Sequence, residues 1–283
     1  MKRNLLLALT IGVLLASCGG EDKKETTYSE WGLNCPVKSI KVTTYEAKNK
    51  FGELTKNGIA EENNYFVAFD TSGKAKTISG FNKDGDLDAV QKYKYDSNGN
   101  LTEVSLYGHD GELLCQQLYE YEGTHEVRFI IKYLWDDDVD TYEHTNEWDG
   151  EKMVSQTTTH NGELQSVTKY SKWDRNGNEW IHYDKDGNER GRGHTMMNET
   201  GFIKQLKNGE YCGEVEYNEK NLPVCVKNAR LLLNTRLSFS SEHQDEVYYA
   251  KYKYDQRGNW IKQTIYEGEM KKPVTISERE INY

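Results

Sequence analysis

The chain has 283 residues and a formal net charge of −10, and only 36% of its residues are hydrophobic. Such an acidic surface repels nucleic acid, so the composition excludes a nucleic-acid-binding protein. The low apolar fraction argues against a thick, closed hydrophobic core. Aromatic residues, which include 20 Tyr and 6 Trp, compensate because their rings cover a sheet face while a polar edge stays in water.

The first segment, residues 1–17, has the organisation of a secretion signal. A short positive stretch with Lys2 and Arg3 precedes the apolar run Leu5–Leu15. This run is too short to cross a bilayer as a stable helix. We therefore predict that residues 1–17 are a signal peptide that is removed.

The signal ends in Leu15-Ala16-Ser17-Cys18, which resembles the bacterial lipobox. The resemblance implies a lipoprotein whose Cys18 thiol carries acyl chains such as palmitate, so that the lipid bilayer is its first partner. Gly19 and Gly20 stand where an Asp is associated with inner-membrane retention, which implies the outer membrane. Residues 18–35 are then a lipidated tether, and both the cell surface and the periplasmic face stay open.

Four further cysteines follow in a compartment where disulfides form, namely Cys35, Cys115, Cys212 and Cys225. None has the spacing of a metal site. Cys212 and Cys225 lie on the two arms of one predicted hairpin. A bridge between them and two free, partly buried thiols are both open.

The most informative internal feature is a turn that recurs as an aromatic residue, Asp, two residues, Gly and Asn. An Asp three positions before a Gly suits a hairpin turn, because the carboxylate caps the turn amides and the Gly adopts the left-handed conformation. Looser copies occur at residues 69–73, 81–85, 107–111 and 197–201. The structural pairs in the four good copies are Asp96 and Gly99, Asp174 and Gly177, Asp184 and Gly187, and Asp255 and Gly258.

Between the turns, segments rich in Val, Ile, Thr, Tyr and Trp predict strands. These include residues 92–95, 101–107, 180–183, 246–254 and 260–266. No helical periodicity of useful length follows the signal. The prediction is an all-β fold over residues 36–283, an antiparallel meander of repeated hairpins in an elongated or gently curled open sheet.

Residues 93–102, with the sequence YKYDSNGNLT, resemble the Rhs/YD repeat, whose pattern is YxYDxxGxLT. Residues 252–261 match its first half. The segments 36–41 and 276–283 resemble the ends of uncharacterised YD-like lipoproteins, so the resemblance covers roughly residues 37–283. It implies an antiparallel meander and brings no catalytic residues.

Several candidate sites have a simpler structural reading. The loop Asp184–Asn188 has alternating oxygen ligands but lacks the bidentate carboxylate of a calcium loop, and the acidic run 136–140 reads as a solvated loop. No nucleophile, His motif or phosphate loop is present, so we predict no enzyme, metal or other cofactor. Aromatic residues on flat strands could stack on a glycan or protein partner or protect the sheet itself, namely Trp173, Trp180, Tyr183, Trp260 and Tyr266.

Together these features predict a membrane-anchored envelope lipoprotein with a non-catalytic β-repeat domain for binding or scaffolding. The alternative is an accessory component of envelope assembly or nutrient capture at the outer membrane. A hydrolase is the third interpretation.

Overall fold

The computed structural model describes residues 31–135, 138–174, 176–199, 203–208, 211–227, 247–268, 270 and 272–283. Within them the chain forms two compact units: residues 31–88 and 213–283 make unit 1, and residues 89–212 make unit 2. Among the described residues, the regular elements are nineteen strands that belong to one sheet. None of the described residues belongs to a helix long and apolar enough to span a bilayer.

Two strands cross the boundary between the units, and each belongs mainly to the unit that holds most of its residues. The strands of unit 1 are β1 (Ser39–Lys50), β2 (Glu53–Ile59), β3 (Asn64–Phe69), β4 (Ala75–Phe81), β15 (Tyr211–Tyr217), β16 (Pro223–Lys227), β17 (Val247–Tyr254), β18 (Trp260–Glu267) and β19 (Lys272–Asn282). Those of unit 2 are β5 (Leu87–Tyr95), β6 (Leu101–Gly108), β7 (Leu113–Glu122), β8 (His125–Trp135), β9 (Asp138–Asp149), β10 (Lys152–His160), β11 (Glu163–Asp174), β12 (Gly177–Asp184), β13 (Glu189–Met197) and β14 (Ile203–Asn208).

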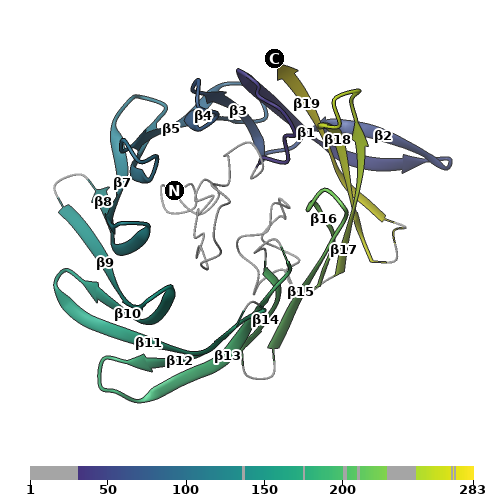
Figure 1. The fold of residues 1–283 in the computed structure, drawn as a ribbon. Helices are drawn as coiled ribbons and strands as arrows, with labels where there is room; N and C mark the ends of the chain where they lie inside the picture. The colour runs from purple at the N-terminus through teal and green to yellow at the C-terminus, as the bar shows by residue number, and fades with distance from the viewer. Residues whose placement is uncertain are drawn as a thin grey trace. The chain divides into compact units, whose positions relative to one another are not determined.

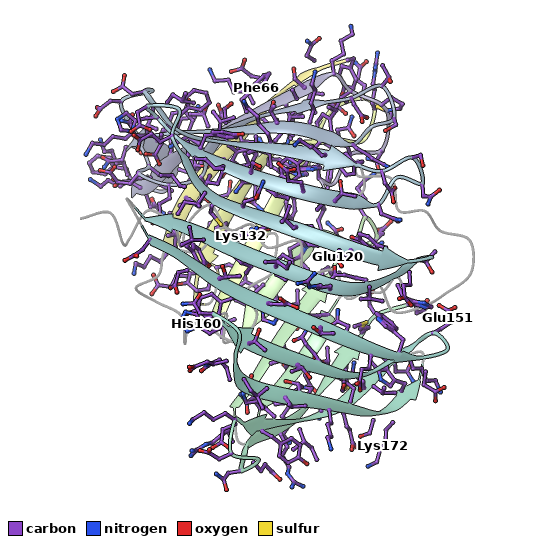
Figure 2. The ribbon with its side chains drawn as sticks, turned by 90° about the vertical axis from the view of Figure 1, so that its left-hand side faces the viewer. Phe66, Glu120, Lys132, Glu151, His160 and Lys172 are labelled. Carbon is purple, nitrogen blue, oxygen red and sulfur yellow. The ribbon has the colours of Figure 1, made fainter. Side chains whose placement is uncertain are left out.

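Unit 2 is an antiparallel meander in which successive strands from β5 to β14 pair with one another. The register places Val104, Gln117 and Ile131 directly opposite their neighbours across three strands. Side chains of paired residues share a face of the sheet. Figure 2 shows this sheet with its side chains, among them Glu120 on β7, Lys132 on β8 and His160 on β10.

In unit 1 the first and last strands of the domain are neighbours. β19 pairs antiparallel with β1, with Ile40 opposite Ile281, and β1 also pairs with β3. Figure 1 shows β1 and β19 side by side. The predicted all-β, antiparallel fold is confirmed, but the predicted open sheet is wrong, because this pairing closes the sheet on itself. A closed sheet has no edge there to attract another chain.

The repeated turns have the geometry that a capping carboxylate produces. Asp96 Oδ1 accepts hydrogen bonds from the backbone N–H groups of Asn98 and Asn100, at 2.9 and 2.8 Å. Gly99 has φ +90°, in the left-handed region. Asp184 and Asp255 make the same pair of bonds to the second and fourth residues after them.

The fourth good copy of the turn is built differently. Asp174 and Gly177 pair directly with each other as the ends of β11 and β12. Gly177 has φ +144°, and a Cβ there would lie 1.8 Å from Thr195 O. A strand packed closely on this glycine is therefore a second reason for its lack of a side chain.

Each unit has its own core. In unit 1, Ile40, Val67 and Ile276 are fully buried, and a second cluster joins Val42, Leu222 and Trp260. In unit 2 one buried cluster joins Val104, Tyr119 and Phe129, with half-buried tyrosines packed against it, and Leu106 and Ile130 are buried as well.

Candidate binding site

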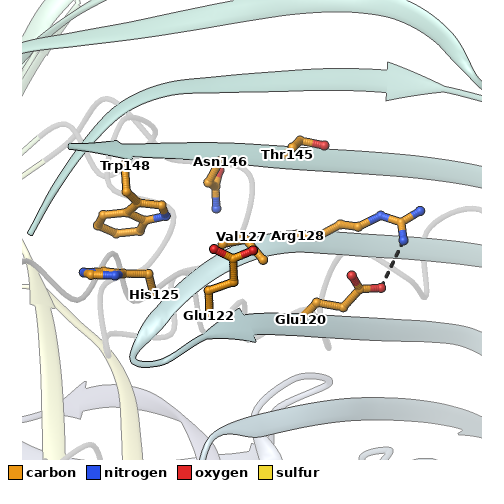
Figure 3. Close-up of a pocket in the computed structure, with 8 residues that line it drawn as sticks. All are labelled: Glu120, Glu122, His125, Val127, Arg128, Thr145, Asn146 and Trp148. Atoms are coloured by element: carbon orange, nitrogen blue, oxygen red, sulfur yellow. Dashed lines mark hydrogen bonds and ion pairs between the residues drawn. The ribbon is translucent and has the colours of Figure 1, made fainter. Parts of the chain in front are cut away.

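A hollow of about 470 Å³ opens in unit 2 beside the turn that joins β7 to β8. Figure 3 shows its lining, which comes from three neighbouring strands: Glu120 and Glu122 on β7, His125, Val127 and Arg128 on β8, and Thr145, Asn146 and Trp148 on β9. Its volume is in the range that accommodates a small ligand. The lining combines one indole ring with several charged and polar groups.

The indole of Trp148 is fixed by two contacts. Its Nε1 donates a hydrogen bond of 2.9 Å to the backbone carbonyl of Glu126. The imidazole of His125 lies against it, with ring centroids 4.6 Å apart, and is itself held by Glu151 at 3.1 Å. A ring held in this way presents a ready-made apolar surface to a ligand.

The carboxylates of the site differ in their partners. Glu120 binds Arg128 at 3.0 Å, and Arg128 also makes a bidentate pair with Glu143 at 2.8 and 2.9 Å. Among the described residues, Glu122 has no ion pair or hydrogen bond to its carboxylate. Figure 3 shows that carboxylate among the lining side chains, with no dashed line to any of them. Glu122 is therefore the charge in the lining that is left for a ligand.

Behind the lining, the partly buried carboxyl of Glu126 is held by Asn146. Asn146 Nδ2 donates to the carbonyl of Glu126 at 3.1 Å and to its Oε1 at 3.4 Å. Burial raises the pKa of Glu126 to about 7, and the hydrogen bond from Asn146 opposes that rise. This carboxyl changes charge near neutral pH, within hydrogen-bonding distance of a lining residue.

The five aromatic residues predicted for a binding face do not line this hollow. Trp173 is half-buried and donates from Nε1 to the carbonyl of Met153 at 2.7 Å, and Trp180 lies against Gly193. Trp260 is buried in unit 1, and the guanidinium of Arg279 lies 3.4 Å from its ring centroid.

The two tyrosines of that set each lie under a lysine. Lys169 Nζ is 5.7 Å from the ring centroid of Tyr183 in unit 2, and Lys251 Nζ is 5.3 Å from that of Tyr266 in unit 1. Their role as a binding face stays a prediction. Sequence reasoning missed Trp148, although Trp148-Asp149-Gly150 is a shortened version of the aromatic-Asp-Gly pattern.

Other candidate groups are engaged locally. The Asp184 carboxylate caps its own turn and binds Arg190 at 2.7 Å, and within the described residues no group of His, Cys, Asp or Glu is arranged to hold a metal. In the acidic run, Asp140 binds His160 at 2.6 Å. Cys18, Asp136 and Asp137 lie outside the described residues.

The four described cysteines are free thiols. Cys225 lies opposite Glu216 in the β15–β16 pairing, so the register does not place Cys212 across from it.

No family model and no curated protein sequence matches the chain. Among solved structures, it is similar to a porin-like protein from Bacteroides uniformis, at 10% identity and a TM-score of 0.40, over 87% of this chain and 97% of the other. A porin-like protein from Bacteroides vulgatus is similar at 11% identity and a TM-score of 0.36. This match covers 88% of this chain and 99% of the other. The TcdB2-TccC3-TEV structure is similar at 11% sequence identity and a TM-score of 0.26. This match covers 77% of this chain and 16% of the other. Similarity at this level does not extend to function.

Proposed function

We propose that this chain is a lipid-anchored lipoprotein of the outer membrane whose β-sheet domain binds a small, polar, positively charged ligand without transforming it. The observation that carries the binding role is the hollow in unit 2, where the unpaired carboxylate of Glu122 and the held indole of Trp148 face the same space. An aromatic ring and a free carboxylate are the groups that recognise an ammonium group or an amino sugar.

Attachment through Cys18 is supported by the chemistry of the strands. Exposed strand positions in unit 2 carry ion pairs, for example Lys94 with Glu103 at 2.8 Å and Lys172 with Glu179 at 2.8 Å. Charged side chains on a lipid-facing strand are destabilising. Such strand faces suit a domain that stands in water and is held at the bilayer through its acylated N-terminus.

A binding role is favoured over catalysis because the polar groups of the site are occupied. The backbone carbonyl of Glu126 is bound by Trp148 and its carboxyl by Asn146, and Arg128 is shared between two glutamates. A catalytic site needs a nucleophile or a general base aimed at the ligand. Glu122, exposed to water, serves as an anchor for a cation.

The ligand proposal is tested with glucosamine and glucose, which differ by one ammonium group. Calorimetry on the mature chain should detect binding of glucosamine and weaker or no binding of glucose. Glu122→Gln should weaken glucosamine binding about tenfold, the scale of one hydrogen bond to a charged group. Glu112→Gln, at an exposed turn of the same unit, is the matched control. Equal binding of the two sugars, or equal effects of the two variants, would contradict the proposal.

The anchor is tested separately. Cys18→Ala removes the acylation site and leaves the apolar run of the signal intact, so the protein should leave the membrane fraction. A variant that still sediments with membranes after a high-salt wash would show that Cys18 is not the anchor.

A further inference from the structure

The hairpin of β1 and β2 projects from the rest of unit 1. β1 pairs with β19 only as far as Glu46, and beyond that point residues 47–50 pair solely with residues 53–56 of β2. From Lys48 to Leu54 every residue is exposed. Figure 1 shows β2 and the second half of β1 extending away from the neighbouring strands of this unit. The tip of the hairpin thus contacts no other described part of the unit.

An aromatic residue occupies this tip in an energetically unfavourable, strained backbone conformation. Phe51 is 109% exposed, and its φ of +54° lies in the left-handed region. A bulky side chain is an outlier in that region, where Gly or Asn would be favourable. The backbone N–H of the neighbouring Gly52 already donates a hydrogen bond of 2.9 Å to Asn49 Oδ1. The turn therefore does not need a phenyl group, and strained, exposed residues of this kind concentrate at functional positions.

Two lysines flank the ring without a carboxylate partner. Among the described residues, neither Lys48 nor Lys50 makes an ion pair, whereas Lys56 further down the hairpin is bound to Glu278 at 2.5 Å. Glu53 is the only acidic side chain from Lys48 to Leu54. Leu54, on β2 opposite Asn49, is 39% exposed. An apolar tip with free lysines on an acidic protein suits the headgroup region of a bilayer.

The bilayer that holds Cys18 is within reach of the tip. The ring of Trp31 packs on Tyr65, which lies opposite Val42 on β1. Phe51 lies nine residue steps beyond Val42, or about 30 Å along the strand direction. Trp31 lies thirteen steps beyond Cys18, which can span at most about 45 Å. Lipidation at Cys18 would therefore hold the hairpin at a high local concentration near the membrane surface.

We propose that the β1–β2 hairpin is a second membrane contact, in which Phe51 inserts among the lipid headgroups and Lys48 and Lys50 bind anionic lipid. The proposal rests on the membrane attachment inferred above and is independent of the ligand site in unit 2. It orients the lipoprotein on the bilayer instead of leaving it free on its tether.

The test measures tryptic cleavage after Lys50 with the mature chain held on vesicles. A histidine tag placed before residue 18 attaches the chain to phosphatidylethanolamine–phosphatidylglycerol vesicles through a nickel-chelating lipid, so the result does not depend on acylation. Cleavage after Lys50 should be about tenfold slower on vesicles than in solution, the factor expected from burying a Phe side chain. Cleavage after Lys185, exposed in another turn, should be unchanged.

Phe51→Asn is the critical variant, because Asn accepts the left-handed conformation and keeps the hairpin while removing the ring. It should abolish the protection, and Leu164→Asn, at another exposed apolar residue, should not. Vesicles of phosphatidylcholine should protect less. Protection of the untethered chain in solution would show a contact between copies and overturn the proposal. Equal cleavage on and off the vesicles would also overturn it. A finding that Cys18 carries no acyl chain in cells would refute the proposed lipid anchor, but it would leave the result on the hairpin unchanged.

Discussion

The two units bury different kinds of side chain. The largest fully buried side chains all lie in unit 1, among them Ile40, Val67, Ile78, Val226 and Ile276. In unit 2 the buried cluster that contains Val104 is largely aromatic, with the ring centroids of Tyr119 and Phe129 stacked 4.7 Å apart. We therefore expect burial of aliphatic side chains to contribute more to the stability of unit 1 than to that of unit 2. The hollow lined by Glu122 and Trp148 lies in unit 2.

The largest expected effect comes from removing an aliphatic side chain in unit 1. Ile276→Ala should lower the free energy of unfolding by about 3 kcal/mol, because the site is enclosed and leaves a cavity. Ile181→Ala, at a half-buried position of unit 2, should cost about 1 kcal/mol. Urea denaturation measures both. Equal losses would mean that the two units are stabilised in the same way.

Glu126 makes the stability of unit 2 dependent on pH. Its pKa is raised from 4.5 to about 7, so the folded state retains the proton after the unfolded state has lost it. Stability from this group is therefore present below pH 4.5 and is lost as pH rises to 7. Glu126→Gln should remove that dependence, so between pH 4 and 8 the stability of the variant should rise by about 3 kcal/mol relative to that of the wild type. Denaturation at the two pH values tests this, and parallel curves would contradict it.

Substitutions at two turn glycines with almost the same φ, one in each unit, allow a direct comparison of the units. Gly258 has φ +79°, and a Cβ there would lie 3.1 Å from Lys220 Nζ and 3.2 Å from Asn34 Nδ2. Gly187, at +81°, has open space in the same direction. Gly258→Val should cost more than about 1 kcal/mol from backbone strain and crowding. Gly187→Val should cost less, since only strain acts there. Thermal melting ranks the two, and the reverse order would show that crowding at Gly258 is unimportant.

The smallest effect is expected at the ion pairs of Arg128. This side chain is 39% exposed, and its glutamate partners are also reached by solvent. Arg128→Gln should cost about 0.5 kcal/mol at low salt and less at high salt. Denaturation at two ionic strengths measures the difference. A large loss that does not depend on salt would place Arg128 among the main stabilising residues of unit 2.

Local sequence alone predicted the parts of this protein that depend on local interactions. The capped turns at Asp96 and Asp184 can be recognised because the carboxylate and the amides that it binds lie within four residues. Strand positions follow from side chains that alternate in polarity and favour an extended backbone. The membrane anchor at Cys18 is likewise a prediction from adjacent residues.

Only the tertiary structure decided how distant segments meet. The pairing of Ile40 with Ile281 closes the sheet. Neither segment contains a sequence pattern that predicts the other as its partner strand. The hollow depends in the same way on register, which brings Glu122, His125 and Trp148 together from three strands. Periodicity specifies which face of a strand is apolar, but the partner is selected by packing across the whole sheet, and that selection has no local signature.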